Sequence, residues 1–198
     1  MLQNSSLLYL CTQAASIYPG INQSILSMWL IVVLIIIVIV LVISITWTRS
    51  RGAPWAPTPM SMVHKMLTMA EVGPDDLVYD LGCGDGRMII TAARRYGSRA
   101  VGIELDPLRY LWCQMLITIL GLRDRITIIY GDFFTQNLSE ANVVTCYLLQ
   151  KTNNKLERKL MQELQSGTRV VSNYFTFSNL RLVRQDKEAE LYMYLPGF

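Results

Sequence analysis

Short hydrophobic runs alternate with segments of helical periodicity through the C-terminal part of the chain. Runs rich in β-branched and aromatic residues predict strands at residues 77–81, 100–104, 125–130, 141–149 and 169–175. Apolar residues that recur on one helix face predict helices at residues 60–70, 88–96, 106–121 and 153–165. Two further runs, at 180–184 and 190–195, predict a closing hairpin. Strands that alternate with helices predict an α/β fold, a Rossmann-like doubly wound sheet with helices on both faces.

The longest apolar run lies near the N-terminus. Residues 25–47 contain no charged side chain and consist mostly of Ile, Val and Leu. A helix of this length measures roughly 34 Å, enough to cross a hydrocarbon core of about 30 Å. Trp29 and Trp47 fall near its two ends, where indole rings favour the membrane interface. The run is too long for a signal-peptide core. We therefore expect one transmembrane helix rather than a buried core helix.

Charge near this run predicts an orientation. Residues 1–48 carry no charged side chain, whereas Arg49 and Arg51 follow immediately. By the positive-inside rule, the segment 1–24 lies outside the cytoplasm and the C-terminal domain, residues 60–198, lies in the cytoplasm. Residues 48–59 form a basic, proline-rich connector, which is either a plain linker or a strap that places Trp55 in a ligand pocket.

Composition narrows the possible partners. The chain has 18 basic and 15 acidic residues, a formal net charge of +3, and no long basic run interleaved with aromatic residues. Nucleic acid is therefore not expected as a partner. None of the four cysteines pairs with another at metal-ligand spacing, so we expect no metal site and interpret them as small core residues.

A glycine-rich stretch that follows the first predicted strand carries the candidate chemistry. It reads Asp-Leu-Gly-Cys-Gly-Asp-Gly from Asp80 to Gly86. A dinucleotide site requires G-x-G-x-x-G, but here the third glycine comes one place early and Arg87 occupies the expected position. The glycines let a ligand approach the backbone, and Asp80 can face a cationic group on that ligand. A dinucleotide site and a chance glycine turn are the alternatives.

Acidic residues also end the next two predicted strands. Glu104, 18 residues past Gly86, can accept hydrogen bonds from both hydroxyls of a ribose. Asp132 could accept from an adenine amino group, with Phe133 beside the ring, or it could cap the following turn. These strand ends meet at one edge of a parallel sheet. The expected cofactor-binding residues are Asp80, Gly82, Cys83, Gly84, Gly86, Glu104, Asp132 and Phe133.

The run D-x-G-x-G-x-G at residues 80–86 resembles motif I of class I S-adenosylmethionine (SAM) dependent methyltransferases. Residues from about 53 to 198 look like this superfamily, and within it like the small lysine methyltransferases of archaea and of the mitochondrial membrane. The resemblance rests on residues 57–59, 80–87, 143–149, 153–156 and 167–171. The chain shares with that family the lack of an N-P-P-Y signature. It departs from close microbial relatives at Asn173-Tyr174, where they often carry His-Asp.

This resemblance implies SAM as cofactor and direct transfer of its methyl group to a lysine amine of a protein, at or near the membrane. Tyr147, Gln150 and Asn173 are the candidate catalytic residues that would face the amine, with strand-end packing as the alternative for each. Other hypotheses are a methyltransferase for a membrane lipid, an isoprenoid or a small molecule, and a membrane-tethered module that binds SAM without catalysis. A dinucleotide oxidoreductase is a more distant alternative.

Overall fold

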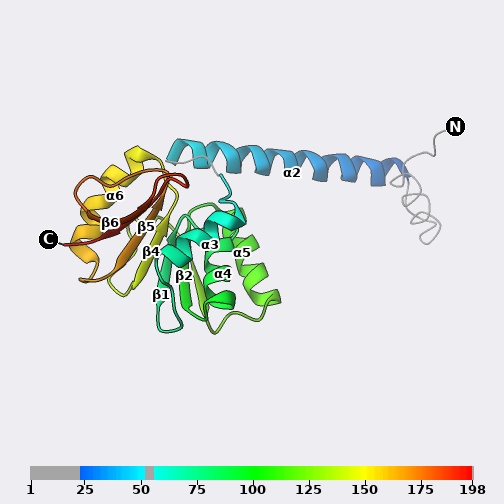
Figure 1. Ribbon diagram of the computed structural model, residues 1–198. Coiled ribbons are helices and arrows are strands. Elements are labelled where there is room, and N and C mark those ends of the chain that lie inside the picture. Colours follow the sequence, from blue (N-terminus) through cyan, green and yellow to red (C-terminus); the bar gives the residue numbers. More distant parts are fainter. Residues whose placement is uncertain (1–22, 52–55, 198) are drawn as a thin grey trace. The chain divides into compact units, whose positions relative to one another are not determined.

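The computed structural model describes residues 23–51 and 56–197 (Figure 1). The chain divides into two units, Met1–Ile43 and Ser44–Phe198. Helix α2, Gln23–Arg51, contains the segment for which the sequence predicts a membrane span. Its side chains are described at residues 24–40 and 42, and nearly all of them are exposed. Within the described residues, no helix is long and apolar enough to cross a membrane. The side chain of Trp47 and the whole of Trp55 lie outside the described residues.

The second unit is built on a seven-stranded sheet of order β3-β2-β1-β4-β5-β7-β6. The strands are β1 Leu77–Leu81, β2 Arg99–Glu104, β3 Ile126–Tyr130, β4 Val143–Cys146, β5 Arg169–Asn173, β6 Arg181–Asp186 and β7 Leu191–Leu195. The first five strands are parallel, and β7 runs antiparallel to both β5 and β6. This arrangement confirms the doubly wound α/β fold and the closing hairpin that the sequence predicts.

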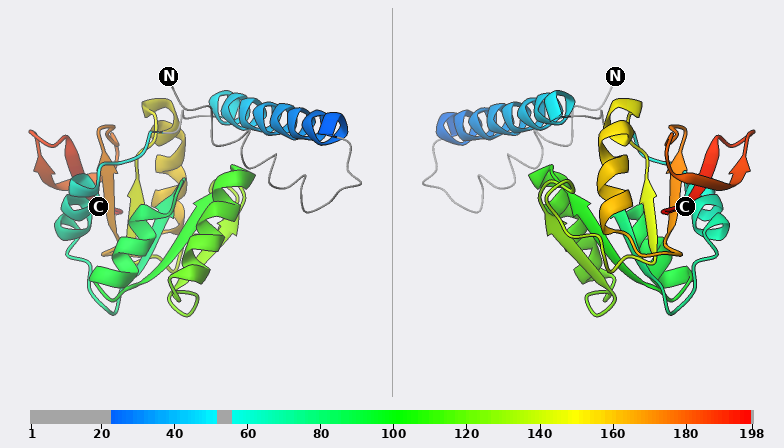
Figure 2. Two further views of the ribbon diagram at one scale, coloured as in Figure 1. Left: turned by 90° about the vertical axis from the view of Figure 1, so that its right-hand side faces the viewer. Right: turned by 90° about the vertical axis from the view of Figure 1, so that its left-hand side faces the viewer.

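Helices cover both faces of the sheet, as expected (Figure 2). They are α3 Met60–Met69, α4 Arg87–Arg95, α5 Pro107–Ile119 and α6 Gln150–Glu163. Helices α3, α4 and α5 pack on one face, and α6 packs on the other. Because β-strand side chains alternate between faces, Val78 of β1 points toward α3 and α4, whereas its neighbour Tyr79 points toward α6.

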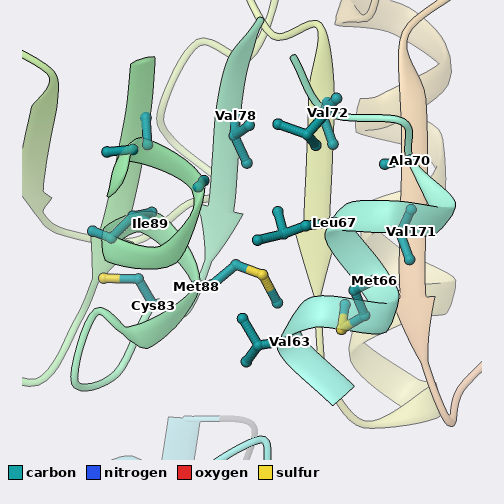
Figure 3. Packing of buried hydrophobic residues seen from close by; sticks show 14 of the residues in the cluster. Val63, Met66, Leu67, Ala70, Val72, Val78, Cys83, Met88, Ile89 and Val171 are labelled. Atoms are coloured by element: carbon teal, nitrogen blue, oxygen red, sulfur yellow. The ribbon is translucent and has the colours of Figure 1, made fainter. Parts of the chain in front are cut away.

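Aliphatic and methionine side chains fill the core under α3 and α4 (Figure 3). Val63 and Leu67 of α3 and Ile89 of α4 are completely buried there, against Val78 and Val171 of the sheet. The buried residues of both core clusters come from residues 63–194. The second unit thus carries its own hydrophobic core.

The order of the strands fixes where a ligand site can form. The chain passes from β1 outward through β2 to β3, and then returns to place β4 on the other side of β1. The carboxyl ends of β1 and β4 therefore border the point where the strand order reverses, and open α/β sheets bind ligands at such a point. The glycine-rich stretch follows β1 directly at this position.

Gly102 of β2 lies directly behind the glycine-rich turn, where there is no room for a side chain. A Cβ atom at this position would lie 2.7 Å from Cys83 Sγ and 2.7 Å from Ile89 Cδ1, both of which are buried. We predict that Gly102→Ala lowers the free energy of unfolding by about 1–3 kcal/mol, because the added methyl group overpacks the space behind the glycine-rich turn. Urea unfolding of the full chain measures this change.

Gly73→Ala is the matched control for this substitution. No atom lies within 4 Å of a Cβ placed at Gly73, so its free energy of unfolding is expected to stay within about 0.5 kcal/mol of the parent value. Equal stabilities of the two variants would show that the packing behind the turn tolerates a side chain.

Candidate active site

The turn between β1 and α4 depends on glycines. Gly82, Gly84 and Gly86 have φ angles of +81°, +58° and +82°, a region that side-chain-bearing residues rarely adopt. Gly86 is also the N-cap of α4, and a Cβ there would collide with Cys113 Sγ of α5. The amides of Gly82 and Cys83 donate hydrogen bonds of 2.9 and 3.0 Å to the Ile103 carbonyl, which fastens the turn to β2.

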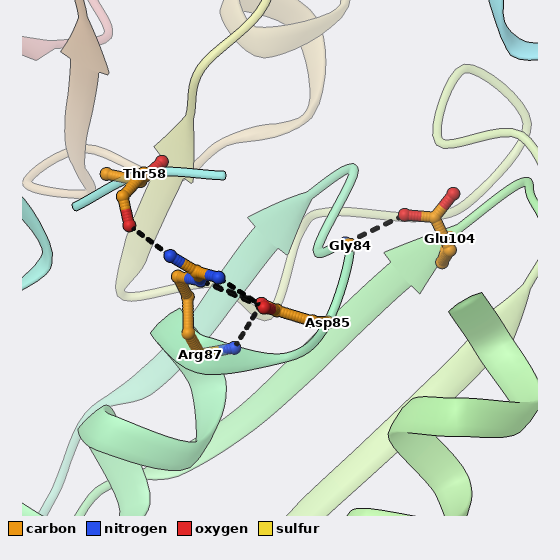
Figure 4. A network of polar contacts seen from close by, with 5 residues as sticks. All are labelled: Thr58, Gly84, Asp85, Arg87 and Glu104. Atoms are coloured by element: carbon orange, nitrogen blue, oxygen red, sulfur yellow. Dashed lines mark hydrogen bonds and ion pairs between the residues drawn. The ribbon is translucent and has the colours of Figure 1, made fainter. Parts of the chain in front are cut away.

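Glu104, the last residue of β2, links this turn to the next one. Its Oε2 accepts a hydrogen bond of 2.7 Å from the Gly84 amide (Figure 4). Its Oε1 accepts one of 2.8 Å from the Asp106 amide. Asp106 in turn caps α5 by accepting from the amides of Leu108 and Arg109. The Arg109 guanidinium lies 3.9 Å from Glu104 Oε1. These contacts fix a buried carboxylate at the carboxyl edge of the sheet.

Asp80, at the end of β1, is a second buried carboxylate. Its Oδ1 accepts a hydrogen bond of 2.8 Å from Thr145 Oγ1 of β4, and its exposed fraction is only 8%. Burial raises the pKa of Asp80 to about 7. The negative charges of Glu104 and Asp85 add to this rise, and the Thr145 hydrogen bond opposes it. A cationic ligand group beside Asp80 would favour the ionised form.

A charged pair ties the segment 56–58 to the turn (Figure 4). The Arg87 guanidinium binds the Asp85 carboxylate through Nε, at 2.9 Å, and through Nη2, and its Nη1 donates a hydrogen bond of 2.7 Å to the Thr58 carbonyl. Burial alone would raise the pKa of Asp85, but the hydrogen bonds and charge of Arg87 outweigh it and lower that pKa. The end of the proline-rich connector is thereby held across the start of α4.

These groups border one cavity. Seven of the residues that the sequence singles out line it: Asp80, Gly82, Cys83, Gly84, Glu104, Phe133 and Tyr147. Ala56, Pro57 and Thr58 at the end of the connector also line it, whereas Trp55, the residue that the strap hypothesis places in the pocket, lies outside the described residues. The cavity lies where the sheet order reverses, so the strand-end argument correctly predicts its place.

Four of the singled-out residues do not line this cavity, and each has another contact or position. Gly86 faces Cys113 and α4. Asp132 is exposed and caps the following turn, its Oδ1 accepting from the Phe134 amide at 2.9 Å, which is the alternative that the sequence leaves open. The Gln150 amide group donates to the Thr176 carbonyl at 2.8 Å and accepts from the Thr176 amide. Asn173 is buried at the end of β5.

Other lining residues are not among those that the sequence predicts. Arg109 reaches the cavity from the first turn of α5, and Thr152 reaches it from α6. Arg109 could have been found, because it lies three residues after the N-cap Asp106 and therefore on the same helix face. Nothing in the spacing of Thr152 distinguishes it from the other polar residues of α6.

The cavity suits a ligand with a cation and a diol better than a phosphate. Two buried carboxylates, Asp80 and Glu104, flank the turn, and they would repel a pyrophosphate at the start of α4. The oxygens of Glu104 can accept further hydrogen bonds from ribose hydroxyls. Asp80 can neutralise an ammonium group, and Phe133 offers an apolar surface. The residues present therefore fit SAM, and within the described residues no group of three potential ligands is placed to hold a metal ion.

The fold and this cleft define a class I SAM-dependent methyltransferase. The family model described as the ANTKMT methyltransferase domain matches residues 80–184, more than half of the chain, and the chain belongs to this family. It is 48% identical over 123 residues to the protein-lysine N-methyltransferase of Saccharolobus islandicus, a match that covers 62% of this chain and 76% of that protein. It is 31% identical over 123 residues to the adenine nucleotide translocase lysine N-methyltransferase of Mus musculus.

The animal relatives are longer proteins. The match covers 62% of this chain and 53% of the mouse protein, so the chain spans about half the length of such relatives. Among solved structures, the RNA methyltransferase from Salinibacter ruber, in complex with S-adenosyl-L-homocysteine, is 39% identical. Its TM-score is 0.67, and the match covers 72% of this chain and 95% of that one.

The raised pKa of Asp80 predicts how stability depends on pH. In the unfolded chain this carboxyl titrates near 4, whereas in the folded chain it titrates at about 7. Between these pH values the folded state binds more protons than the unfolded state. The contribution of Asp80 to the free energy of unfolding therefore falls as pH rises and levels off above about pH 7. The total fall is of the order of a few kcal/mol.

Asp80→Asn removes this titration. We therefore expect the difference in unfolding free energy between the variant and the parent to grow in favour of the variant between about pH 4 and pH 7, as measured by urea unfolding without ligand. Taking the difference cancels the titration of all other groups. Parallel stability curves for the two proteins would contradict the assignment.

Proposed function

We propose that this chain transfers a methyl group from SAM to a lysine amine of a protein. The observation that carries the methyl-donor part is the buried Glu104 carboxylate, bound to the Gly84 amide beside Asp80 in the cavity. The acceptor part is supported by the 48% identity to a protein-lysine N-methyltransferase and by the further lysine methyltransferases among the relatives.

SAM supplies a methyl group on a sulfonium, which is already an activated leaving group. The chain therefore mainly has to align the reactants and exclude water. Glu104 is held at both oxygens by backbone amides, so its remaining lone pairs have a fixed direction for ribose hydroxyls. Asp80 lies on the neighbouring strand, where its carboxylate would hold the ammonium of the amino-acid part.

The acceptor side of the cavity is less charged. Tyr147 and Leu148 follow β4, Thr152 lies in the first turn of α6, and these residues line the cavity together with Pro57. A lysine amine has a pKa near 10.4 in water and must lose its proton before it attacks the methyl group. An apolar surrounding lowers that pKa, so these residues would favour the neutral amine without a dedicated base. The exposed fraction of Tyr147, 37%, leaves it accessible to a substrate.

We also propose that residues 25–47 anchor the chain in a membrane, with segment 1–24 outside and the methyltransferase domain in the cytoplasm. The support comes from the sequence: an uncharged run of Ile, Val and Leu followed at once by Arg49 and Arg51. The apolar side chains described in α2, such as Ile31 and Leu34, are exposed. Such an anchor would favour lysine residues of membrane-associated proteins as acceptors.

RNA is the second candidate acceptor, because the Salinibacter protein is called an RNA methyltransferase. The near balance of 18 basic and 15 acidic residues in the whole chain weighs against it. Proteins that bind RNA nonspecifically through its phosphates carry a marked basic surface. The charge of the chain therefore weighs against RNA as the acceptor.

Methyl-labelled SAM tests the proposal. The full chain in detergent is incubated with labelled SAM and a membrane extract, and protein, RNA and lipid fractions are then separated. We predict label in protein, which disappears when lysine amines are acetylated beforehand, because acetylation converts each amine into an amide that is not nucleophilic. Glu104→Ala is expected to lower the labelling at least about 100-fold, since it removes both the ribose acceptor and the support of the turn.

The other fractions give the contradicting results. Label in RNA or in lipid would assign a different acceptor. SAM binding without label in any fraction would favour a binding module that lacks catalysis. Failure to bind SAM would overturn the assignment of the cavity itself.

A further inference from the structure

Helix α5 is apolar on two opposite faces. Its inner face, with Cys113 and Ile117, is fully buried against the sheet. Its outer face consists of large apolar side chains at helical spacing: Leu108, Leu111, Trp112, Met115 and Ile119. Their exposed fractions are 37%, 60%, 51%, 43% and 70%. We call these five residues the outer face of α5.

This outer face differs from the remaining exposed apolar residues of the domain. Elsewhere in its described residues, large exposed apolar side chains are spread over several elements, such as Leu182 and Val183 of β6 and Met161 of α6. Five on one face of a single helix form a continuous stripe, because residues three and four apart lie next to each other. Apolar side chains that gather on one helix face differ from single exposed apolar residues, which are normal on a protein surface.

The outer face of α5 alone is much smaller than the surface that a stable dimer buries. A helix of 13 residues is about 20 Å long and about 10 Å wide, so its face covers roughly 200 Å². A stable interface buries about 800 Å² on each partner. An interfacial helix on a lipid bilayer needs no such area, because it inserts its apolar side chains between the lipid headgroups.

Charge also favours a lipid surface. Helix α5 contains no acidic residue, and its one charged residue, Arg109, is engaged at the cavity by Glu104 and Asp106, at 3.9 and 3.8 Å. Arg123, just beyond the helix, donates a hydrogen bond of 2.9 Å to Thr118 Oγ1 in the last turn, which places a cation beside the end of the stripe. Aliphatic and Trp side chains bordered by arginine are typical of helices that lie in the membrane interface, where arginine binds lipid phosphates.

We propose that the outer face of α5 lies on the surface of a lipid bilayer. The first turn of α5 also borders the cavity through Arg109, so the stripe begins beside the cofactor site. Contact of α5 with lipid would bring that side of the cavity to the headgroup level. Acceptor lysines would then be those that lie at the membrane surface.

The reach of the chain is compatible with this placement. Eight residues, 52–59, separate α2 from α3 and can span at most about 28 Å. If residues 25–47 are inserted as proposed above, the helical residues 48–51 add about 6 Å, so α3 begins within about 34 Å of the bilayer. Even a weakly lipid-binding face would then be occupied, because the anchor gives it a high effective concentration. The inference rests on that anchoring but not on lysine as the acceptor.

A local probe tests this inference in the full chain. Cys83, Cys113 and Cys146 are buried, so a single reporter cysteine can be labelled once Cys11→Ser has removed the remaining thiol. An environment-sensitive fluorophore is placed by Ile119→Cys or, as the matched control, by Leu182→Cys on β6, which is also exposed. The labelled chain is reconstituted in vesicles of phosphatidylcholine and phosphatidylglycerol that contain a nitroxide-labelled lipid. SAM binding of each labelled protein confirms that it is folded.

The label at residue 119 is expected to shift its emission to the blue and to lose about half of its intensity to the lipid quencher, since an interfacial helix lies within about 10 Å of the headgroups. The label at residue 182 is expected to stay unquenched. Equal quenching at both positions, or none at residue 119, would overturn the inference. So would a label at 119 that is shielded by a second copy, seen as a doubled mass in detergent.

The test separates this inference from the proposed function. A chain that does not float with the vesicles would overturn the anchoring and the inference that rests on it. Methyl transfer measured on the same samples reports on the catalytic proposal alone. Active, floating protein with an unquenched label at residue 119 would overturn only the role of α5.

Discussion

The hydrogen bond between the Glu104 carboxylate and the Gly84 amide is the constraint on which the site depends. It joins the turn after β1 to the end of β2 at 2.7 Å, and the second oxygen of the same carboxylate joins β2 to the start of α5. Two backbone amides that would otherwise lack an acceptor are satisfied by one buried charge. Any ligand that binds Glu104 therefore binds a group whose position is already fixed, which lowers the cost of ordering it.

The same site contains a carboxyl group, that of Asp80, whose ionisation is unfavourable when no ligand is bound. Asp80 is buried beside Glu104 and Asp85, and its raised pKa expresses the cost of ionising it there. A cationic ligand would offset that cost. The cost of ionising Asp80 therefore both destabilises the ligand-free protein and favours the binding of a cation. The Arg87–Asp85 pair adds a second connection, because it holds Thr58 of the connector over the start of α4.

Much of this arrangement can be predicted from the sequence. Strands and helices alternate with clear periodicities, so the doubly wound sheet and the hairpin β6–β7 are predicted correctly. Asp80 and Glu104 are found because parallel strands end at one edge of a sheet, whatever the details of their packing. The sequence also predicts that Gly82 and Gly84 form the turn at that edge, because a tight turn needs residues that can adopt a positive φ.

Side-chain direction is what the sequence does not specify. The sequence predicts that Gln150 faces the amine, but this side chain binds Thr176, a residue 26 positions away whose proximity depends on the whole fold. Asp132 binds the nearby Phe134 amide, because a short acidic side chain readily caps its own turn. Helical periodicity predicts α5 and the face with Cys113 and Ile117 that is buried, but only the structure shows that a second apolar face of this helix is exposed.

The most direct test of the central claim is the dissociation constant for SAM, measured by calorimetry on the full chain and on Glu104→Gln. Glutamine can accept only one of the two backbone hydrogen bonds, so we expect a loss of affinity of about 10- to 100-fold. Glu163→Gln is the matched control, because Glu163 also accepts a backbone hydrogen bond, from Leu138 at 3.0 Å, but does not line the cavity. Its affinity should equal that of the parent. An unchanged dissociation constant for Glu104→Gln would contradict the account.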